Sequence, residues 1–174
     1  MKTLPVDANQ KELTNLVIEW IELLAQENYA KALDFILYDN TQEVDGKIWK
    51  WTPERLEASV YTCGLPWYSK DEMRQLYGVD YPVDGKVTSI LNRQDKEVWL
   101  EGNLISIHKF DGVISSQQAE LWGISHLDYQ NIIGEIMFDG VPIDGKRSDL
   151  TALFWIKKLD SNQITLIFRD LHMM

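Results

Sequence analysis

The chain has 174 residues, which suits a single domain large enough to bury a substantial core without disulfides or metal ions. Hydrophobic residues make up 45% of the sequence and charged residues 25%, which are normal proportions for a soluble globular protein. The formal net charge of −10 makes nucleic acid and anionic lipid unfavourable partners and suits a basic protein instead.

The N-terminal residues MKTLPVDANQKEL contain one early Lys and no apolar segment, so we expect no secretory signal. Glu, Asp or Lys interrupts every long apolar run, so we expect no membrane span. Cys63 is the only cysteine, which excludes an intrachain disulfide and a multi-cysteine zinc site. These features favour a cytoplasmic protein.

The first expected element is an amphipathic helix over residues 10–27. A second helix follows almost directly and is expected to end near Asp39 and Asn40. The first helix should lie with its apolar face in the hollow of a sheet formed by the C-terminal half of the chain. That face is a stripe with the spacing i, i+3, i+4, i+7, i+8 and i+11, which consists of Leu13, Leu16, Val17, Trp20, Ile21 and Leu24.

Residues 47–51 are expected to form a short strand, and two short helices are expected after it. Thr52 and Pro53 match an N-cap followed by proline at the first helical position, where the missing N–H costs nothing. Residues 69–72 (SKDE) match a capping box, in which the Glu side chain bonds back to the backbone N–H of the Ser. Gly78 is the expected end of that helix.

Beyond residue 82 the pattern changes to that of a mostly antiparallel sheet. Candidate strand 150–159 is apolar on both faces, which indicates that both faces are covered. In candidate strand 97–108 the apolar phase changes at Gly102 and Asn103, where a bulge would bend the sheet. The other candidate strands are 86–92, 118–127, 132–139 and 163–172.

The triplet Asp-Gly-Lys occurs three times, at residues 45–47, 84–86 and 144–146. Asp-Gly favours positive φ and is typical of hairpin turns, and each copy lies beside a candidate strand. The copies are 39 and 60 residues apart, which excludes a regular repeat, and the residues that follow lack the oxygen ligands of a calcium loop. We therefore interpret the triplet as a turn.

Helices followed by a mostly antiparallel sheet indicate one α+β domain over residues 1–174, with a helical part over about 1–81 and a sheet part over about 82–174. The element order resembles that of NTF2-like (cystatin-like) proteins, which implies a bent sheet wrapped as a cone around the N-terminal helix. The segment PIDGKRSDLTALFWIKK, followed by ITLIFRDLHMM, resembles the end of a bacterial domain family of unknown function. That second resemblance implies neither an activity nor catalytic residues.

Candidates for acid–base chemistry lie in the C-terminal half. If the last strand is regular, Asp170 and His172 share the face of its alternating apolar residues, and the carboxylate could orient the ring. In NTF2-like enzymes such pairs project into the cone, so the resemblance implies a dyad of Asp170 with His126 or His172. The alternatives are an exposed His172 at the chain end and a half-buried, hydrogen-bonded His126. No metal-ligand spacing is present, so we expect no metal site and no cofactor.

Seven of the nineteen aromatic residues lie between residues 49 and 81. Trp67 and Tyr68 fall in the expected loop GLPWYSKDE and are the candidate binding residues, because Trp and Tyr offer large contact areas with a polar tip. The alternative is that the aromatic set closes the open end of the sheet as part of the core.

Three functions follow from these patterns. The first is a non-enzymatic protein-binding module, such as an immunity or antitoxin-like protein, whose acidic surface suits a basic partner. The second is a small-molecule-binding protein or acid–base enzyme with an NTF2-like pocket that holds His126, Asp170 and Tyr29. The third is a homodimeric structural module that uses the apolar face containing Leu153 and Trp155. The first function is the leading hypothesis.

Overall fold

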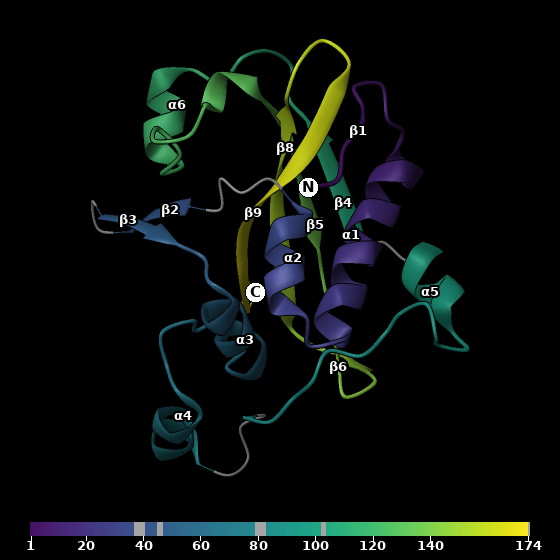
Figure 1. The fold of residues 1–174 in the computed structure, drawn as a ribbon, viewed down its shortest axis with the longest axis vertical. Coiled ribbons are helices and arrows are strands. Elements are labelled where there is room, and N and C mark those ends of the chain that lie inside the picture. The colour runs from purple at the N-terminus through teal and green to yellow at the C-terminus, as the bar shows by residue number, and fades with distance from the viewer. Residues whose placement is uncertain (37–40, 45–46, 79–82, 102–103, 174) are drawn as a thin grey trace.

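The computed structural model describes residues 1–36, 41–44, 47–78, 83–101 and 104–173. Within these ranges the chain is an α+β protein, as the element order predicted, with helices packed on a curled antiparallel sheet (Figure 1). The helices are α1 (Gln10–Ala25), α2 (Tyr29–Phe35), α3 (Pro53–Tyr61), α4 (Lys70–Tyr77), α5 (Lys96–Glu101), α6 (Ser116–Leu121) and the short 3₁₀ helix η1 (Tyr129–Asn131).

The main sheet runs through the C-terminal half of the chain and takes in one short strand from the N-terminus. Its neighbours pair antiparallel throughout. Two separate hairpins complete the described strands, β2 (Thr41–Val44) with β3 (Lys47–Lys50) and β6 (Pro142–Ile143) with β7 (Lys146–Arg147). The strand order in the main sheet is β1 (Leu4–Pro5), β9 (Gln163–Met173), β8 (Leu150–Lys158), β5 (Ile132–Phe138) and β4 (Ile105–Lys109).

Helix α1 packs its apolar stripe against one face of the main sheet. Every residue of the predicted stripe is buried. The ring of Trp20 lies 5.0 Å from that of Phe154 in β8 and 5.1 Å from that of Phe168 in β9. Its indole N–H donates to the carbonyl of Ala32 in α2, so the buried polar atom is satisfied. The prediction that the N-terminal helix lies against the sheet is confirmed.

The opposite face of β8 and β9 is covered by residues 110–131, which include α6. A second apolar cluster forms there, in which Trp155 of β8 stacks on Trp122 with ring centroids 5.7 Å apart. Strand β8 is therefore covered on both faces, as its double apolar pattern indicated. Trp155, one of the two residues that motivated a homodimer, is buried by the chain itself, and Leu153 is half-buried.

A bulge in β9 changes which residues face the core. Leu153 pairs with Asp170 while the next residue of β8 pairs with Phe168, so Arg169 has no opposite residue. The extra residue shifts the alternation by one position, and Leu171 becomes the buried residue of this end of the strand. The last strand is therefore not regular, and the condition under which Asp170 and His172 would share the face of its alternating apolar residues is not met. Asp170 and His172 lie on the face opposite α1.

Two other candidate strands also proved wrong in part or in full. Segment 86–92 forms turns and a single isolated bridge between Val87 and Ile143. Segment 97–108 begins as α5 and becomes strand β4 at Ile105, and the predicted bulge at 102–103 falls outside the described residues.

Segment 118–127 is helix α6 followed by turns and not a strand. Ser115 caps the helix, because its hydroxyl accepts from the backbone N–H of Gln118 while the Gln118 side chain accepts from the Ser115 N–H. This reciprocal capping fixes the helix start, and it overrides the alternating apolar residues that favoured a strand.

Local end signals were predicted correctly. Thr52 caps α3 through its hydroxyl, Ser69 caps α4 in a capping box, and Gly78 ends α4 at a φ of 77°. The third Asp-Gly pair forms the tight turn between β6 and β7, where Asp144 and Gly145 have φ values of 49° and 77°. None of the described helices combines the length and the apolarity needed to cross a bilayer.

Candidate binding sites

The predicted acid–base pair forms, although on the face of the sheet opposite α1. Nδ1 of His172 lies 2.9 Å from Oδ2 of Asp170, and both side chains are half-buried. His172 is paired with Thr151 of β8, so it lies within the sheet. The carboxylate thereby fixes the orientation of the imidazole ring.

His126 does not join this pair. Its Nε2 lies 3.2 Å from the carbonyl oxygen of Thr41, and because a carbonyl can only accept, this nitrogen carries the proton. Its Nδ1 is buried without a hydrogen-bond partner within the described ranges. The alternative of a half-buried, hydrogen-bonded histidine is therefore the one that the structure supports.

The space between α1 and the sheet is filled by aromatic rings. Trp20, Phe154 and Phe168 are fully buried, with centroid separations of 5.0 to 5.8 Å among them. Tyr29 and Asp170 line two separate small cavities, of about 140 and 170 Å³. The residues of the hypothesised NTF2-like pocket are therefore not gathered under α1.

Tyr29 has a perturbed ionisation at its small cavity. Burial raises its pKa to about 12, and the negative charges of Glu57 and Glu27 add to the effect. The ring consequently stays neutral at physiological pH. The neighbouring ion pair between Glu27 and Lys86 makes this a polar, charge-compensated recess.

The α3–α4 turn (residues 62–69) carries the two predicted binding residues. Trp67 is 59% exposed, while Tyr68 is half-buried. Hydrogen bonds fix the turn around them. The Thr62 hydroxyl accepts from the Leu65 N–H at 2.9 Å, and the Tyr61 hydroxyl donates to the Tyr68 carbonyl at 3.0 Å. A large apolar side chain is therefore held in solvent by an ordered backbone.

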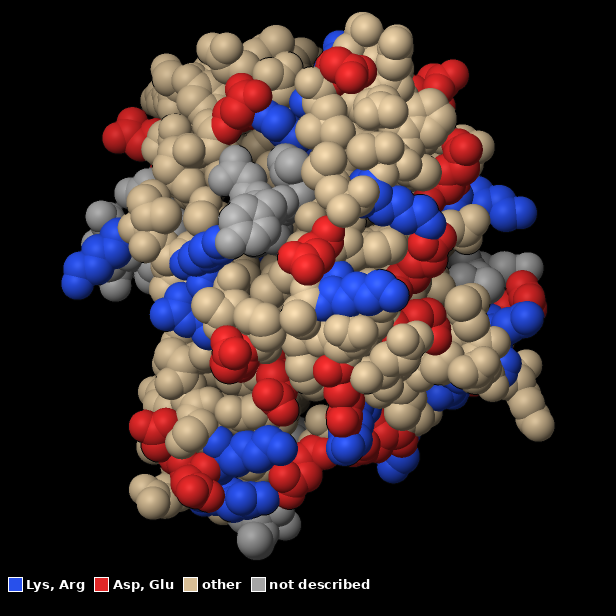
Figure 2. Space-filling model, viewed as in Figure 1, with Lys and Arg blue, Asp and Glu red and all other residues tan. Residues whose placement is uncertain are grey.

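Helix α4 continues this exposed apolar surface along the chain. Leu76 and Tyr77 in its last turn are exposed, whereas Met73 is fully buried and anchors the helix. The same helix also carries charged side chains, of which Lys70 and Arg74 both contact Asp84. Figure 2 shows acidic and basic side chains intermixed over the lower part of the molecule, where α4 lies in Figure 1.

The aromatic residues between 49 and 81 thus divide between core and surface. Trp51 is buried, its ring lies 4.7 Å from that of Phe168, and its indole N–H donates to the Arg169 carbonyl at 3.3 Å. Trp49 is half-buried against Trp51. The interpretation as core holds for these two. Trp67 is exposed, and its role as a contact residue stays a prediction. Tyr81 lies outside the described residues.

A larger cavity, of about 670 Å³, lies where no sequence pattern predicted a binding site. It is bounded by residues 93–99, by Leu104 and by the β6–β7 hairpin. Sequence reasoning missed it because the segments 86–92 and 97–108 had been interpreted as strands. Arg93 and Trp99 lie six residues apart in the sequence, and only the fold brings the guanidinium over the ring.

No three His, Cys, Asp or Glu side chains of the described ranges are grouped in the way that a metal site requires. No family model, curated protein or solved structure matches the chain. The NTF2-like order and the bacterial-family resemblance of the C-terminal quarter therefore stay predictions.

Proposed function

We propose that this protein is a non-enzymatic binding module of the bacterial cytoplasm that recognises a protein partner through Trp67. The observation that carries the proposal is the exposure of Trp67 on a hydrogen-bonded turn. Trp is enriched among the residues that dominate binding energy in protein interfaces, and a preordered position lowers the entropy cost of using it.

The neighbouring helix supplies the rest of the surface. Leu76 and Tyr77 expose further apolar area within ten residues of Trp67 in the sequence. Charged side chains near them, among them Asp71 and Arg74, provide the polar surroundings that protein interfaces use around an apolar anchor.

The charge of the chain suggests the class of partner. A net charge of −10 attracts basic proteins and accelerates their association, and it disfavours acidic ones. The concrete form of the proposal is an immunity or antitoxin-like protein that covers a basic partner.

The experiment is a capture of partners from bacterial extract at low ionic strength, followed by calorimetry with the purified partner. We expect Trp67→Ala to weaken binding by about thirtyfold, which is the effect of losing a contact of about 2 kcal/mol. Raising the salt concentration should slow association, because exposed charges are screened.

Leu121→Ala is the matched control, because Leu121 is a comparably exposed apolar residue on α6. Leu121→Ala should unfold within about 0.5 kcal/mol of the wild type, and Trp67→Ala within about 1 kcal/mol, because Trp67 is 59% exposed and only part of its side chain is buried. A partner whose affinity falls equally in the two variants, or in neither, would show that Trp67 is not the anchor.

A further inference from the structure

The cavity between α5 and the β6–β7 hairpin has the build of a ligand site that is separate from Trp67. Its volume of about 670 Å³ lies within the range of small-molecule pockets. Trp99 and Leu104 are almost fully buried and form its apolar lining. Val98, which is 68% exposed, stands at its opening.

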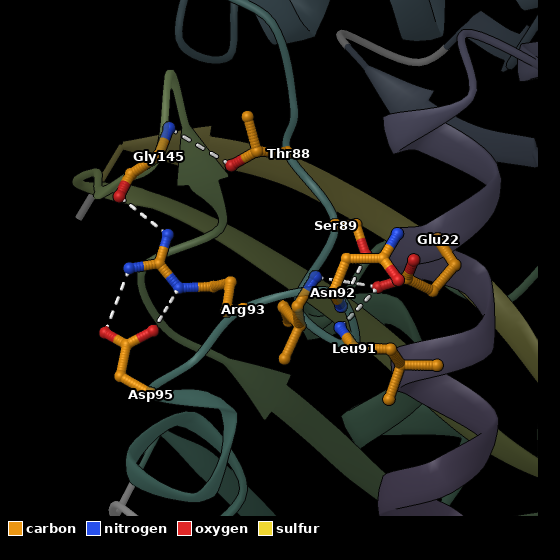
Figure 3. Close-up of polar contacts among 9 residues, drawn as sticks. Glu22, Thr88, Ser89, Leu91, Asn92, Arg93, Asp95 and Gly145 are labelled. Atoms are coloured by element: carbon orange, nitrogen blue, oxygen red, sulfur yellow. Dashed lines mark hydrogen bonds and ion pairs between the residues drawn. The ribbon is translucent and has the colours of Figure 1, made fainter.

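The segment 88–95, which contributes Arg93 and Asp95 to the cavity, is held by hydrogen bonds (Figure 3). Arg93 donates to both carboxylate oxygens of Asp95, at 2.7 and 3.0 Å, and to the Gly145 carbonyl at 2.6 Å. Its guanidinium also stacks over the Trp99 ring, 5.0 Å from the centroid. The Arg93 side chain therefore links the 88–95 segment, Trp99 and the β6–β7 hairpin.

Two further contacts hold the 88–95 segment in place. The Gly145 N–H donates to the Thr88 hydroxyl at 3.1 Å. Oε1 of Glu22 in α1 accepts from the backbone N–H groups of Ile90 and Leu91, at 2.7 and 3.1 Å. Figure 3 shows these contacts converging on the 88–95 segment from the helix and from the hairpin. The cavity is thereby ordered before any ligand binds, which lowers the entropy cost of binding.

Two exposed basic residues of β7, Lys146 and Arg147, line the mouth of the cavity. Neither forms an ion pair with a carboxylate whose side chain the structure describes. The charge of Asp95 is taken up by Arg93, and this contact holds the pKa of Asp95 below its ordinary value. In a chain with a net charge of −10, two unpaired cations on one strand favour an anion at this mouth.

The aliphatic part of the Arg147 side chain packs against Gly140. It passes so close to Gly140 that a Cβ on that glycine would lie 2.5 Å from Nε and 2.9 Å from Cδ. Gly140 has a φ of 76° and leaves the space that the stem occupies. Arg147 also lines an adjoining cavity together with Asp139 and Asp149, neither of which lies within ion-pair distance of it.

From these observations we infer that the cavity binds a small amphipathic carboxylate. The apolar body of the ligand packs on Trp99 and Leu104, and its carboxylate reaches Lys146 and Arg147 at the mouth. A guanidinium matches a carboxylate with two parallel hydrogen bonds, which gives direction as well as affinity. This site is independent of the proposed partner surface at Trp67, so either proposal can fail without the other.

The test is isothermal titration of the full chain with decanoate, with decan-1-ol and decylamine as ligands of the same length and different charge. We expect decanoate to bind about tenfold or more tightly than the alcohol, because a charged hydrogen bond is lost with the alcohol, and decylamine to bind less well again. The double variant K146Q/R147Q should bind decanoate about tenfold or more weakly than the wild type does.

Matched variants distinguish binding in this cavity from nonspecific binding to the protein surface. K11Q/K31Q removes two exposed lysines of α1 and α2 and should bind decanoate as the wild type does. Val98→Asp places a negative charge at the mouth without disturbing the core, and should abolish decanoate binding while leaving thermal unfolding unchanged.

Three results would overturn the inference. The first is no binding of decanoate at millimolar concentration, and the second is equal binding of decanoate and decan-1-ol. The third is a dimer in sedimentation analysis that Val98→Asp dissociates, which would make the cavity an interface between two copies of the chain.

Discussion

Glu22 offers the sharpest test of how the 88–95 segment is held. Its carboxylate lies on α1 and accepts two backbone N–H groups from a segment nearly seventy residues away, at 2.7 Å from Ile90 and 3.1 Å from Leu91. Glu22→Ala removes the acceptor and leaves both donors without it.

The cost follows from the burial of the two donors. Ile90 is fully buried, so its N–H loses its partner and gains no water, which costs about 1–3 kcal/mol. Leu91 is exposed, and water can replace the carboxylate there at little cost. We expect Glu22→Ala to lower the free energy of unfolding by about 2 kcal/mol, a fall in Tm of about 4–8 °C for a chain of this size. Glu22→Gln keeps a neutral acceptor and should cost about half as much.

Urea denaturation followed by circular dichroism measures these differences, and hydrogen exchange of the Ile90 amide reports the contact directly. Glu19→Ala is the control on the same helix. Its partner is Lys2 and both side chains are substantially exposed, so its loss should cost less than about 1 kcal/mol. The reasoning is refuted if Glu22→Ala unfolds within about 0.5 kcal/mol of the wild type, or if it costs no more than Glu19→Ala.

Three further changes test other parts of the fold. Lys157 is 8% exposed, and its Nζ lies 2.5 Å from Asp128 Oδ2. Asp128→Asn removes this counter-charge and should lower the free energy of unfolding by about 2 kcal/mol, as measured by urea denaturation at neutral pH. Because the bond lowers the pKa of Asp128, this stabilisation is present above about pH 4 and the two proteins should converge in stability as the pH falls below it. Gly64→Ala should cost more stability than Gly78→Ala, as measured by calorimetry. Both glycines have positive φ, but a Cβ at Gly64 would lie 2.5 Å from the backbone of β9, whereas a Cβ at Gly78 would meet open space. Equal losses of stability would contradict this packing. In an ultraviolet titration Tyr29 should ionise near its pKa of about 12, and Tyr29→Phe should reduce the loss of stability that the wild type shows as the pH rises from 10 toward 12.

The parts of the fold that depend on local chemistry could be predicted from the sequence. An N-cap or a helix end is set by residues three or four positions apart, so Thr52, Ser69 and Gly78 indicated the boundaries of α3 and α4 correctly. The α1 stripe was equally clear, because the helical spacing repeats over about three turns.

Short helices in the second half were mistaken for strands. In α6 the apolar residues alternate over only a few positions, and the capping box between Ser115 and Gln118 was the stronger signal. In α5 the apolar Val98 faces solvent, so hydrophobicity there did not indicate burial in a sheet.

The geometry of the candidate sites depended on contacts between distant residues. The bulge at Arg169 arises from pairing with β8, and it moves Asp170 and His172 to the other face of the sheet. No residue near Arg169 in the sequence predicts this shift. Trp51 and Trp67 also look alike in sequence. Only the first meets the Arg169 carbonyl and is buried.

Hydrogen exchange of the complex with the captured partner tests the central claim most directly. If Trp67 is the anchor, backbone amides between residues 62 and 77 should gain protection on binding, and the gain should disappear in Trp67→Ala at equal protein concentration. Protection that appears on β4 or around residues 93–99 instead, with residues 62–77 unchanged, would contradict the account.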